Sequence, residues 1–225
     1  MSCSSTVNLL LLLLSTSFVI TTCAAATPVK VLVCTESLCP DCEQFVQKQL
    51  VPIYSQLGPD VIDLQVVPYG NARRRINSTT TTIECQHGVG ECDANVYELC
   101  AIYMNPNPND YLPFLDCLAK VLPMGRHDEP LNPQLFENCA SGLLWWSGIQ
   151  ACHGNPATVQ KVLQAAAVAT PSDHQYVPWI TIEGIHLDEE QLDFKTEICK
   201  AFVVANNGES HPACSSTTVL LLLEE

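Results

Sequence analysis

Positively charged residues are scarce in this sequence. The chain of 225 residues carries 10 Lys and Arg against 24 Asp and Glu, which gives a net charge of -14. Its only basic run is Arg73 to Arg75, which we interpret as part of an exposed loop. The composition argues against nucleic acid as a partner, because no basic patch exists to neutralise phosphates.

The sequence also lacks an apolar run of membrane-spanning length. The apolar core near the N-terminus begins with Leu9 to Leu14 and ends at Ile20, which is too short to cross a bilayer. Ala24-Ala25-Ala26 follows as a small-residue cleavage site, so we interpret residues 1–26 as a signal peptide, although no Lys or Arg precedes the leucines. The C-terminal tail, 215–225, has a second apolar run that is shorter still.

Cysteine is abundant by contrast. The chain has 13 cysteines, and 11 of them follow the predicted signal peptide. An exported chain of this kind is expected in an oxidising compartment, with most thiols paired. Because 11 is odd, at least one thiol stays free or pairs with another molecule. Cys34, at the end of an apolar strand, is our candidate for a buried free thiol, and an ordinary bridge is the alternative.

One glycosylation sequon stands in the polar run that follows the arginines. Asn77-Ser78-Thr79 fits the N-x-[ST] pattern, and the threonines after it indicate a surface loop. In an exported protein, Asn77 is therefore a predicted glycan site.

The first part of the predicted domain, which covers 27–214, is β–α–β. Residues 30–34 form a β-branched apolar strand, and a helix follows from Cys39 until Pro52. A second strand is expected over 61–67.

The end of the domain is complementary to its beginning. An alanine-rich helix is expected over 157–169, followed by a hairpin over 177–187 with its turn at Glu183-Gly184. Asp188 is expected to cap a last helix. This half is α–β–β–α.

A cysteine-rich insertion, from 73 to about 155, separates the two halves. Its pattern is helical, with one break from Asn105 to Pro113. We therefore predict one α/β domain in three layers with a helical insertion.

The sequence Cys39-Pro40-Asp41-Cys42 lies where the first strand meets the first helix. The free N–H groups and the positive dipole end of a helix N-terminus favour a thiolate, so Cys39 is the predicted attacking thiol. Cys42 lies one turn further inside and is the predicted resolving thiol. Pro40 suits a first helical turn, whereas the charge of Asp41 raises the energy of the thiolate.

Three other roles for this pair were weighed. A structural bridge would close so short a loop that it stabilises little. A zinc site would need more ligands, and the nearby candidates are Cys85 and His87, since the chain has no second C-x-x-C. A Cys–His nucleophile could use His87, His153 or His174, but their spacing selects none of them. A redox dithiol is therefore favoured, and no metal is expected.

Pro178 is the second candidate feature of the site. In a redox fold of this type, a cis-proline loop faces the dithiol and hydrogen-bonds the substrate backbone. The position of Val177-Pro178 before the first strand of the second half favours a cis peptide and a substrate-positioning role. The alternative is a proline that merely opens a strand.

A longer pattern, C-Q-H-G-x-x-E-C-x-x-N-x-x-x-x-C, runs from Cys85 to Cys100. With the C-x-x-C pair, Val67 to Ala72 and Tyr176 to Trp179, it resembles the gamma-interferon-inducible lysosomal thiol reductase (GILT) family over roughly 30–214. The resemblance implies a thioredoxin-like fold and reduction of disulfides in protein substrates, often at acidic pH in an endolysosomal compartment. Cys39 and Cys42 match the redox pair of the family.

The resemblance leaves the other cysteines as structural. We expect no bound cofactor, only a small external thiol that regenerates the dithiol. Lysosome, vacuole and extracellular space are all open as locations. A secretory-pathway oxidase or isomerase is an alternative function, as is a non-enzymatic binding protein with Trp145-Trp146 in an exposed patch. The expected bridge cysteines, which omit Cys152, are Cys85, Cys92, Cys100, Cys117, Cys139, Cys199 and Cys214.

Overall fold

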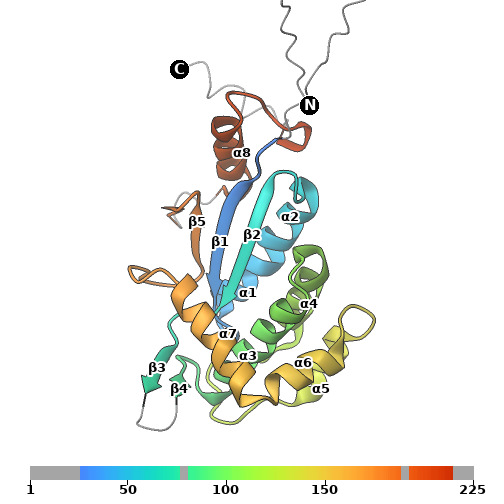
Figure 1. The fold of residues 1–225 in the computed structure, drawn as a ribbon, viewed down its shortest axis with the longest axis vertical. Coiled ribbons are helices and arrows are strands. Elements are labelled where there is room, and N and C mark those ends of the chain that lie inside the picture. The colour runs from blue at the N-terminus through green and yellow to red at the C-terminus, as the bar shows by residue number, and fades with distance from the viewer. Residues whose placement is uncertain (1–25, 77–80, 189–192, 215–225) are drawn as a thin grey trace, which may run out of the picture.

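The structure, a computed structural model, describes residues 26–76, 81–188 and 193–214 (Figure 1). The predicted signal peptide (apart from residue 26), the predicted glycan site at Asn77 and the tail 215–225 lie outside the described residues.

A four-stranded sheet in the order β2-β1-β5-β6 forms the centre of the fold. Strand β1 (Val29–Thr35) pairs in parallel with β2 (Ile62–Pro68) and antiparallel with β5 (Trp179–Ile182), which continues into β6 (Ile185–His186). The valines of β1 are buried, as expected for a central strand between two helical layers. The two halves predicted from the sequence therefore meet at the pairing of β1 with β5.

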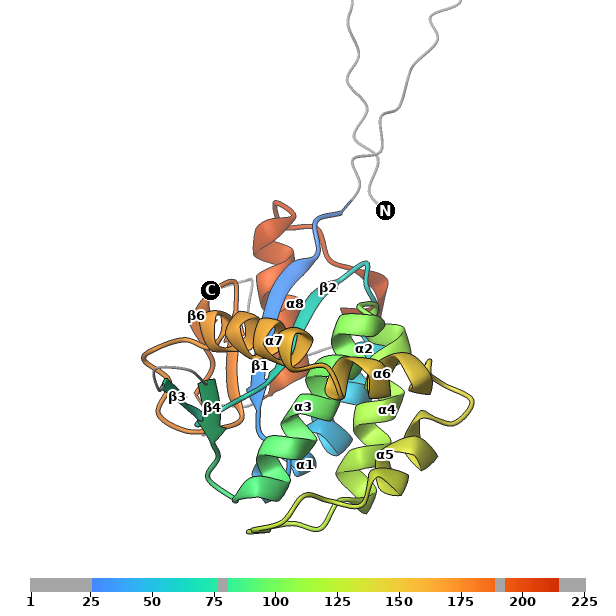
Figure 2. The same ribbon diagram turned by 60° about the horizontal axis from the view of Figure 1, so that its bottom comes forward.

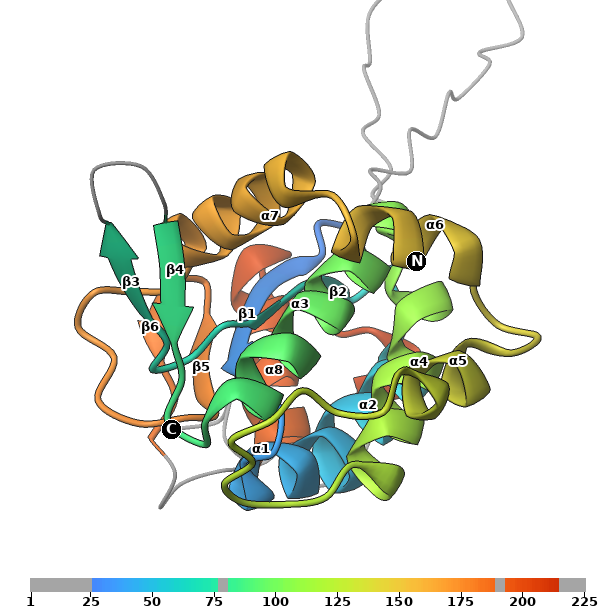
Figure 3. The ribbon, with the colours of Figure 1, turned by 90° about the horizontal axis from the view of Figure 1, so that it is seen from below.

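Helices cover both faces of this sheet (Figures 2 and 3). Helix α1 (Pro40–Phe45) lies on the same side as α8 (Phe194–Ala205), and the rings of Phe45 and Phe194 meet edge to face at 5.2 Å. On the other face, α3 (Val89–Met104) and α7 (Pro156–Ala169) pack against β2. The three-layer α/β arrangement is as predicted.

The insertion begins with strands, which corrects the prediction of a helical segment from residue 73. β3 (Arg73–Ile76) and β4 (Thr81–Glu84) form a separate antiparallel pair. Exposed Arg75 forms an ion pair with Glu84 across it. The β-branched threonines before Glu84 favour strand over helix. Helices follow: α4 (Pro108–Val121), α5 (Pro133–Ala140) and α6 (Trp146–His153).

Pro52 does not end the first helix, contrary to prediction. A π-helical turn, η1 (Val46–Leu50), follows α1, and the chain continues as α2 (Val51–Leu57). In η1 the N–H of Val51 donates to the carbonyl of Val46, one residue further back than in an α-helix. This wider turn displaces the carbonyls that a proline ring would otherwise meet, so Pro52 is accommodated.

Two other predicted boundaries also shift. The break from Asn105 to Pro113 is shorter than expected, because Asn107 caps α4, Pro108 takes its first position and Pro113 lies inside the helix. The last helix is capped by Asp193, whose carboxylate accepts from the N–H of Thr196, and not by Asp188. A short 3-10 turn, η3 (Pro212–Cys214), ends the described chain.

Gly88, in the loop before α3, is the position where we expect a side chain to be least tolerated. Its φ is +88°, and a Cβ there would lie 2.5 Å from the carbonyl oxygen of His127. Gly125 has a φ of +90° but open space around it, so it is a matched control. We expect Gly125→Ala to lose roughly 1–2 kcal/mol for the left-handed backbone alone, and Gly88→Ala to lose more in urea unfolding. Equal losses would contradict the close approach.

Candidate active site

The Cys39–Cys42 pair lies at the C-terminal end of β1, where α1 begins. Cys39 is the N-cap residue of α1, and Cys42 lies in its first turn. The structure contains both as free thiols. Cys39 keeps 7% of its surface exposed and Cys42 only 1%. The predicted order of exposure is therefore observed, although Cys39 does not project into solvent.

The surroundings of Cys39 stabilise its thiolate and lower its pKa from 9.0 to about 6. The main cause is a hydrogen bond from the Cys42 thiol, and backbone N–H groups of Cys42 and Asp41 add to it. Burial and the charge of Asp41 oppose the shift, as the sequence predicted for Asp41. Burial raises the pKa of Cys42 well above its usual value. The two thiols therefore suit the different roles of attacker and resolver.

The loop before β5 lies against this pair. Val177 forms a small buried cluster with Cys39 and Cys42. The peptide between Val177 and Pro178 is cis, in agreement with the sequence-based expectation. The structure thus places the cis peptide that precedes Pro178 next to the dithiol, through Val177.

The loop from Glu36 to Leu38, called here the active-site loop, is held by side chains from α3. The N–H of Ser37 donates to Oδ1 of Asn95 at 2.8 Å, and its hydroxyl donates to Oε1 of Glu98 at 2.6 Å. The N–H of Glu36 donates to the Cys42 sulfur at 3.4 Å. The insertion therefore positions the segment that leads into the dithiol.

The C-Q-H-G segment also contacts α3, through His87 and Glu91. The N–H of His87 donates to Oε1 of Glu91 at 3.2 Å, and the imidazole Nδ1 contacts the other carboxylate oxygen. Glu91 and Asn95 are four residues apart, which places them along one side of α3, and His87 lies in the turn just before this helix. From the sequence we considered His87 as a candidate zinc ligand or base and assigned no role to Glu91 or Asn95, although the spacing of these polar residues is visible in the pattern.

Four buried glutamates lie in or beside the active-site loop, and sequence reasoning assigned a role to none of them. They are Glu36, Glu43, Glu91 and Glu98. Burial is the first cause of a raised pKa in all four, and a neighbouring carboxylate adds to it at three of them. The pKa rises to about 7 at Glu36 and Glu98 and to about 9 at Glu43, and it is also raised at Glu91. Buried carboxyl groups of this kind are neutral at acidic pH.

Comparison of the sequence with known proteins identifies the family. The family described as gamma interferon inducible lysosomal thiol reductase (GILT) matches residues 30–143. The gamma-interferon-inducible lysosomal thiol reductase of Carassius auratus is 32% identical over 194 residues, covering 84% of this chain and 73% of that protein. The chain belongs to the GILT family. The gamma-interferon-responsive lysosomal thiol protein of Arabidopsis thaliana is 30% identical, with 74% of this chain and 68% of that protein covered.

Solved structures support the fold of this GILT-family chain. DsbA from Mycobacterium tuberculosis in its reduced form superposes with a TM-score of 0.60 at 12% identity, covering 89% of this chain and 96% of that one. BdbD from Bacillus subtilis gives 0.58 at 15% identity, with 78% and 88% covered. The fold is thioredoxin-like, as predicted, and the family assignment makes the protein a thiol–disulfide oxidoreductase.

Among the residues that the structure describes, four disulfides stabilise the rest of this GILT-family fold. Every cysteine predicted as structural is bridged, together with Cys152, which we had left unassigned. Cys34 is free, as predicted, and fully buried, and burial raises its pKa to about 12. The bridges are Cys85–Cys92, Cys100–Cys152, Cys117–Cys139 and Cys199–Cys214.

Several residues required by the alternative roles have other partners in this structure. Cys85 is bridged, so it offers no thiolate to a zinc site with the dithiol. His153 is paired with Asp93 at 2.8 Å, and His174 bonds the carbonyl of Pro171 at 2.6 Å. The expected aromatic patch is reduced to Trp145, which is 62% exposed, because Trp146 is half-buried and stacks on Tyr97.

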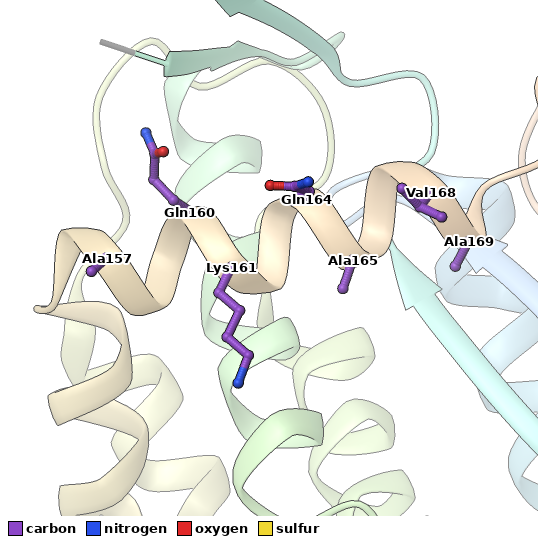
Figure 4. A pocket seen from close by; sticks show the side chains of 7 residues that line it. All are labelled: Ala157, Gln160, Lys161, Gln164, Ala165, Val168 and Ala169. Carbon is purple, nitrogen blue, oxygen red and sulfur yellow. The ribbon is translucent and has the colours of Figure 1, made fainter. Parts of the chain in front are cut away.

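Two surface cavities lie away from the dithiol. A cavity of about 660 Å³ lies along α7, with Gln160 and Gln164 on one side and Lys161 on the other (Figure 4). A second cavity, of about 320 Å³, is bounded by β2, α3 and α7. Neither lining contains a thiol, an imidazole or a carboxyl group. Within the described part of the chain, no helix is long and apolar enough to cross a membrane.

The anchor at Asn95 gives a prediction for stability and activity. Asn95→Ala leaves the buried N–H of Ser37 without its acceptor, so we expect a loss of about 1–3 kcal/mol in urea unfolding and slower disulfide reduction. Asn105→Ala is the matched control, since the Asn105 side chain, directly after α3, donates to the carbonyl of Ala101 in the last turn of that helix. An Asn95→Ala protein as stable and active as the control would contradict the anchoring role.

The lowered pKa of Cys39 gives a prediction for reactivity. Because the thiolate is the nucleophile, alkylation of Cys39 by iodoacetamide should follow its ionisation, with a midpoint near pH 6. The rate falls below that pH as the thiolate takes up a proton. Peptide mapping by mass spectrometry at pH 4 to 8 measures the rate for each cysteine. Cys34 serves as the internal control and should stay unmodified, and a Cys39 midpoint near 9 would contradict the assignment.

Proposed function

We propose that this oxidoreductase works as a disulfide reductase on protein substrates, with Cys39 as the attacking thiol and Cys42 as the resolving thiol. The observation that carries the proposal is the difference between the two thiols. Cys39 accepts hydrogen bonds at the start of α1 and has a lowered pKa, while Cys42, in the next turn, is buried and has a raised one. A mixed-disulfide mechanism needs this order of ionisation.

The reaction transfers two electrons from the enzyme to the substrate. The Cys39 thiolate attacks one sulfur of the substrate disulfide; that S–S bond breaks, a mixed disulfide forms, and the released substrate thiolate takes a proton. Cys42 then loses its proton and attacks the Cys39 sulfur, which releases the second substrate thiol. The enzyme is left with a Cys39–Cys42 disulfide, and a small external thiol returns it to the dithiol form.

Pro178 is the proposed substrate-positioning residue. Its neighbour Val177 belongs to one buried cluster with both thiols, so the backbone at Pro178 borders the place where a substrate sulfur meets Cys39. An extended substrate segment bound there would present its disulfide to the thiolate.

An acidic compartment is the proposed setting. At pH 4.5 a thiol with a pKa of about 6 is about 3% ionised, roughly a thousandfold more than a thiol at 9.0. Acidity also reduces the self-repulsion of a chain with a net charge of -14. These properties suit the endolysosomal or vacuolar end of the secretory pathway, with the extracellular space as the alternative.

The test is the reduction of a denatured, disulfide-bonded protein at pH 4.5 and pH 7 with a small thiol donor. We expect wild type to exceed the donor alone at both pH values, Cys39→Ser to match the donor alone, and Cys42→Ser to accumulate a covalent complex with substrate. Cys34→Ser is the matched control and should keep its activity, because Cys34 is a buried free thiol outside the dithiol.

Two results would overturn the proposal. Reduction by Cys39→Ser at the wild-type rate would remove the dithiol from the mechanism. Oxidation of a reduced substrate faster than reduction of an oxidised one would reverse the direction and favour an oxidase or isomerase.

A further inference from the structure

Three side chains with metal-binding atoms converge beside the active-site loop. Glu36, His87 and Glu91 each offer one ligand atom, and these atoms all lie within 4.8 Å of one another. They come from separate segments, since Glu36 precedes α1 while His87 and Glu91 belong to the C-Q-H-G pattern. The side chains of both glutamates are fully buried, and that of His87 is 17% exposed.

Glu36 has an oxygen that nothing in the described protein satisfies. Its Oε1 accepts the N–H of Asn71, but its buried Oε2 has no hydrogen-bond partner. That oxygen lies 3.9 Å from Nδ1 of His87, so it points into the cluster. A buried carboxylate oxygen without a partner is costly, and a cation between these groups would remove that cost.

The backbone around Glu36 holds it in this position. Gly70 has a φ of +49°, and a Cβ there would lie 2.2 Å from Cγ of Glu36. The absence of a side chain at residue 70 leaves this space to Glu36. On the other side, the N–H of His87 holds Oε1 of Glu91, so the other carboxylate oxygen is directed to the imidazole. The partial exposure of His87 supplies a route for an ion to enter.

The donor chemistry and the spacing fit a transition metal ion. One imidazole nitrogen with two carboxylate oxygens is a ligand set for Zn²⁺ and similar ions, whereas Ca²⁺ needs six or more oxygens. Ligands about 2.1 Å from a tetrahedral ion stand about 3.4 Å apart, so small side-chain movements close the cluster on an ion. We propose that Glu36, His87 and Glu91 bind one divalent transition metal ion such as Zn²⁺, with a fourth position open to water.

This site differs from the zinc site weighed from the sequence, because it uses no cysteine and shares only His87 with it. Binding would join the C-Q-H-G segment to the active-site loop by a direct link, in addition to the Ser37–Asn95 bond. The proposal is independent of the redox reaction, since its ligands include neither thiol.

The test is isothermal titration of the full chain with ZnCl₂ at neutral pH, after chelator treatment and with Cys39 and Cys42 oxidised to a disulfide. Oxidation prevents the two thiolates from binding zinc themselves. We expect one Zn²⁺ per chain with micromolar or tighter affinity. With Co²⁺ in place of zinc, the absorption spectrum should show d–d bands and no sulfur-to-cobalt charge-transfer band.

Variants distinguish this site from adventitious binding. Glu36→Gln keeps the size of the side chain and the acceptor for Asn71 but removes the charge, so we expect affinity to fall about tenfold or more. Asp93→Asn is the matched control, because it removes a carboxylate from the His153 pair, for which the described residues offer no third ligand; its affinity should be unchanged. His87→Gln tests the same site if Glu36→Gln does not fold, as judged by circular dichroism. No saturable binding to wild type, or wild-type affinity in folded Glu36→Gln or His87→Gln, overturns the proposal.

Discussion

The contact between α3 and the active-site loop is the interaction on which the rest of the site depends. Leu38, immediately before Cys39, has a φ of +68°, a conformation that a branched side chain avoids unless its surroundings hold it. Asn95 and Glu98 hold the preceding residue, Ser37, through its N–H and its hydroxyl. The insertion is therefore a support for the dithiol, and disulfides at Cys92 and Cys100 fix the helix that provides it.

Opposite electrostatic effects operate within a few residues of this contact. Cys39 and Cys42 differ by three positions, yet the pKa of one falls and that of the other rises. The difference arises because the Cys42 thiol and, to a smaller extent, free N–H groups at the start of α1 donate hydrogen bonds to the Cys39 sulfur, while the Cys42 sulfur is enclosed by the protein. Burial also raises the pKa of the nearby glutamates Glu43 and Glu98. These two side chains are therefore uncharged at acidic pH and place no negative charge beside Cys39.

The sequence predicted the β–α–β and α–β–β–α halves because each follows a local hydrophobic period. The prediction failed where another part of the structure changes the effect of a residue. At Pro52, for example, the preceding π-helical turn makes room for the proline ring, so the helix continues. The thiols were found from their place between a strand and a helix. Their support was missed because Ser37 and Asn95 are 58 residues apart, and a single sequence does not reveal such a pairing. Cys152 was missed for the same reason, since its partner lies 52 residues away.

A dithiol enzyme whose described residues include eight bridged cysteines has to protect its own disulfides from its reactive thiol. Only a thiolate attacks a disulfide, and Cys39 is the one free thiol of the described chain with a lowered pKa. Cys34 remains protonated because burial raises its pKa to about 12. The bridges Cys100–Cys152 and Cys199–Cys214 are buried at both sulfurs, whereas Cys92 and Cys117 leave the other two bridges partly exposed. An attacking sulfur needs access to its target, so burial protects these two buried bridges from the Cys39 thiolate.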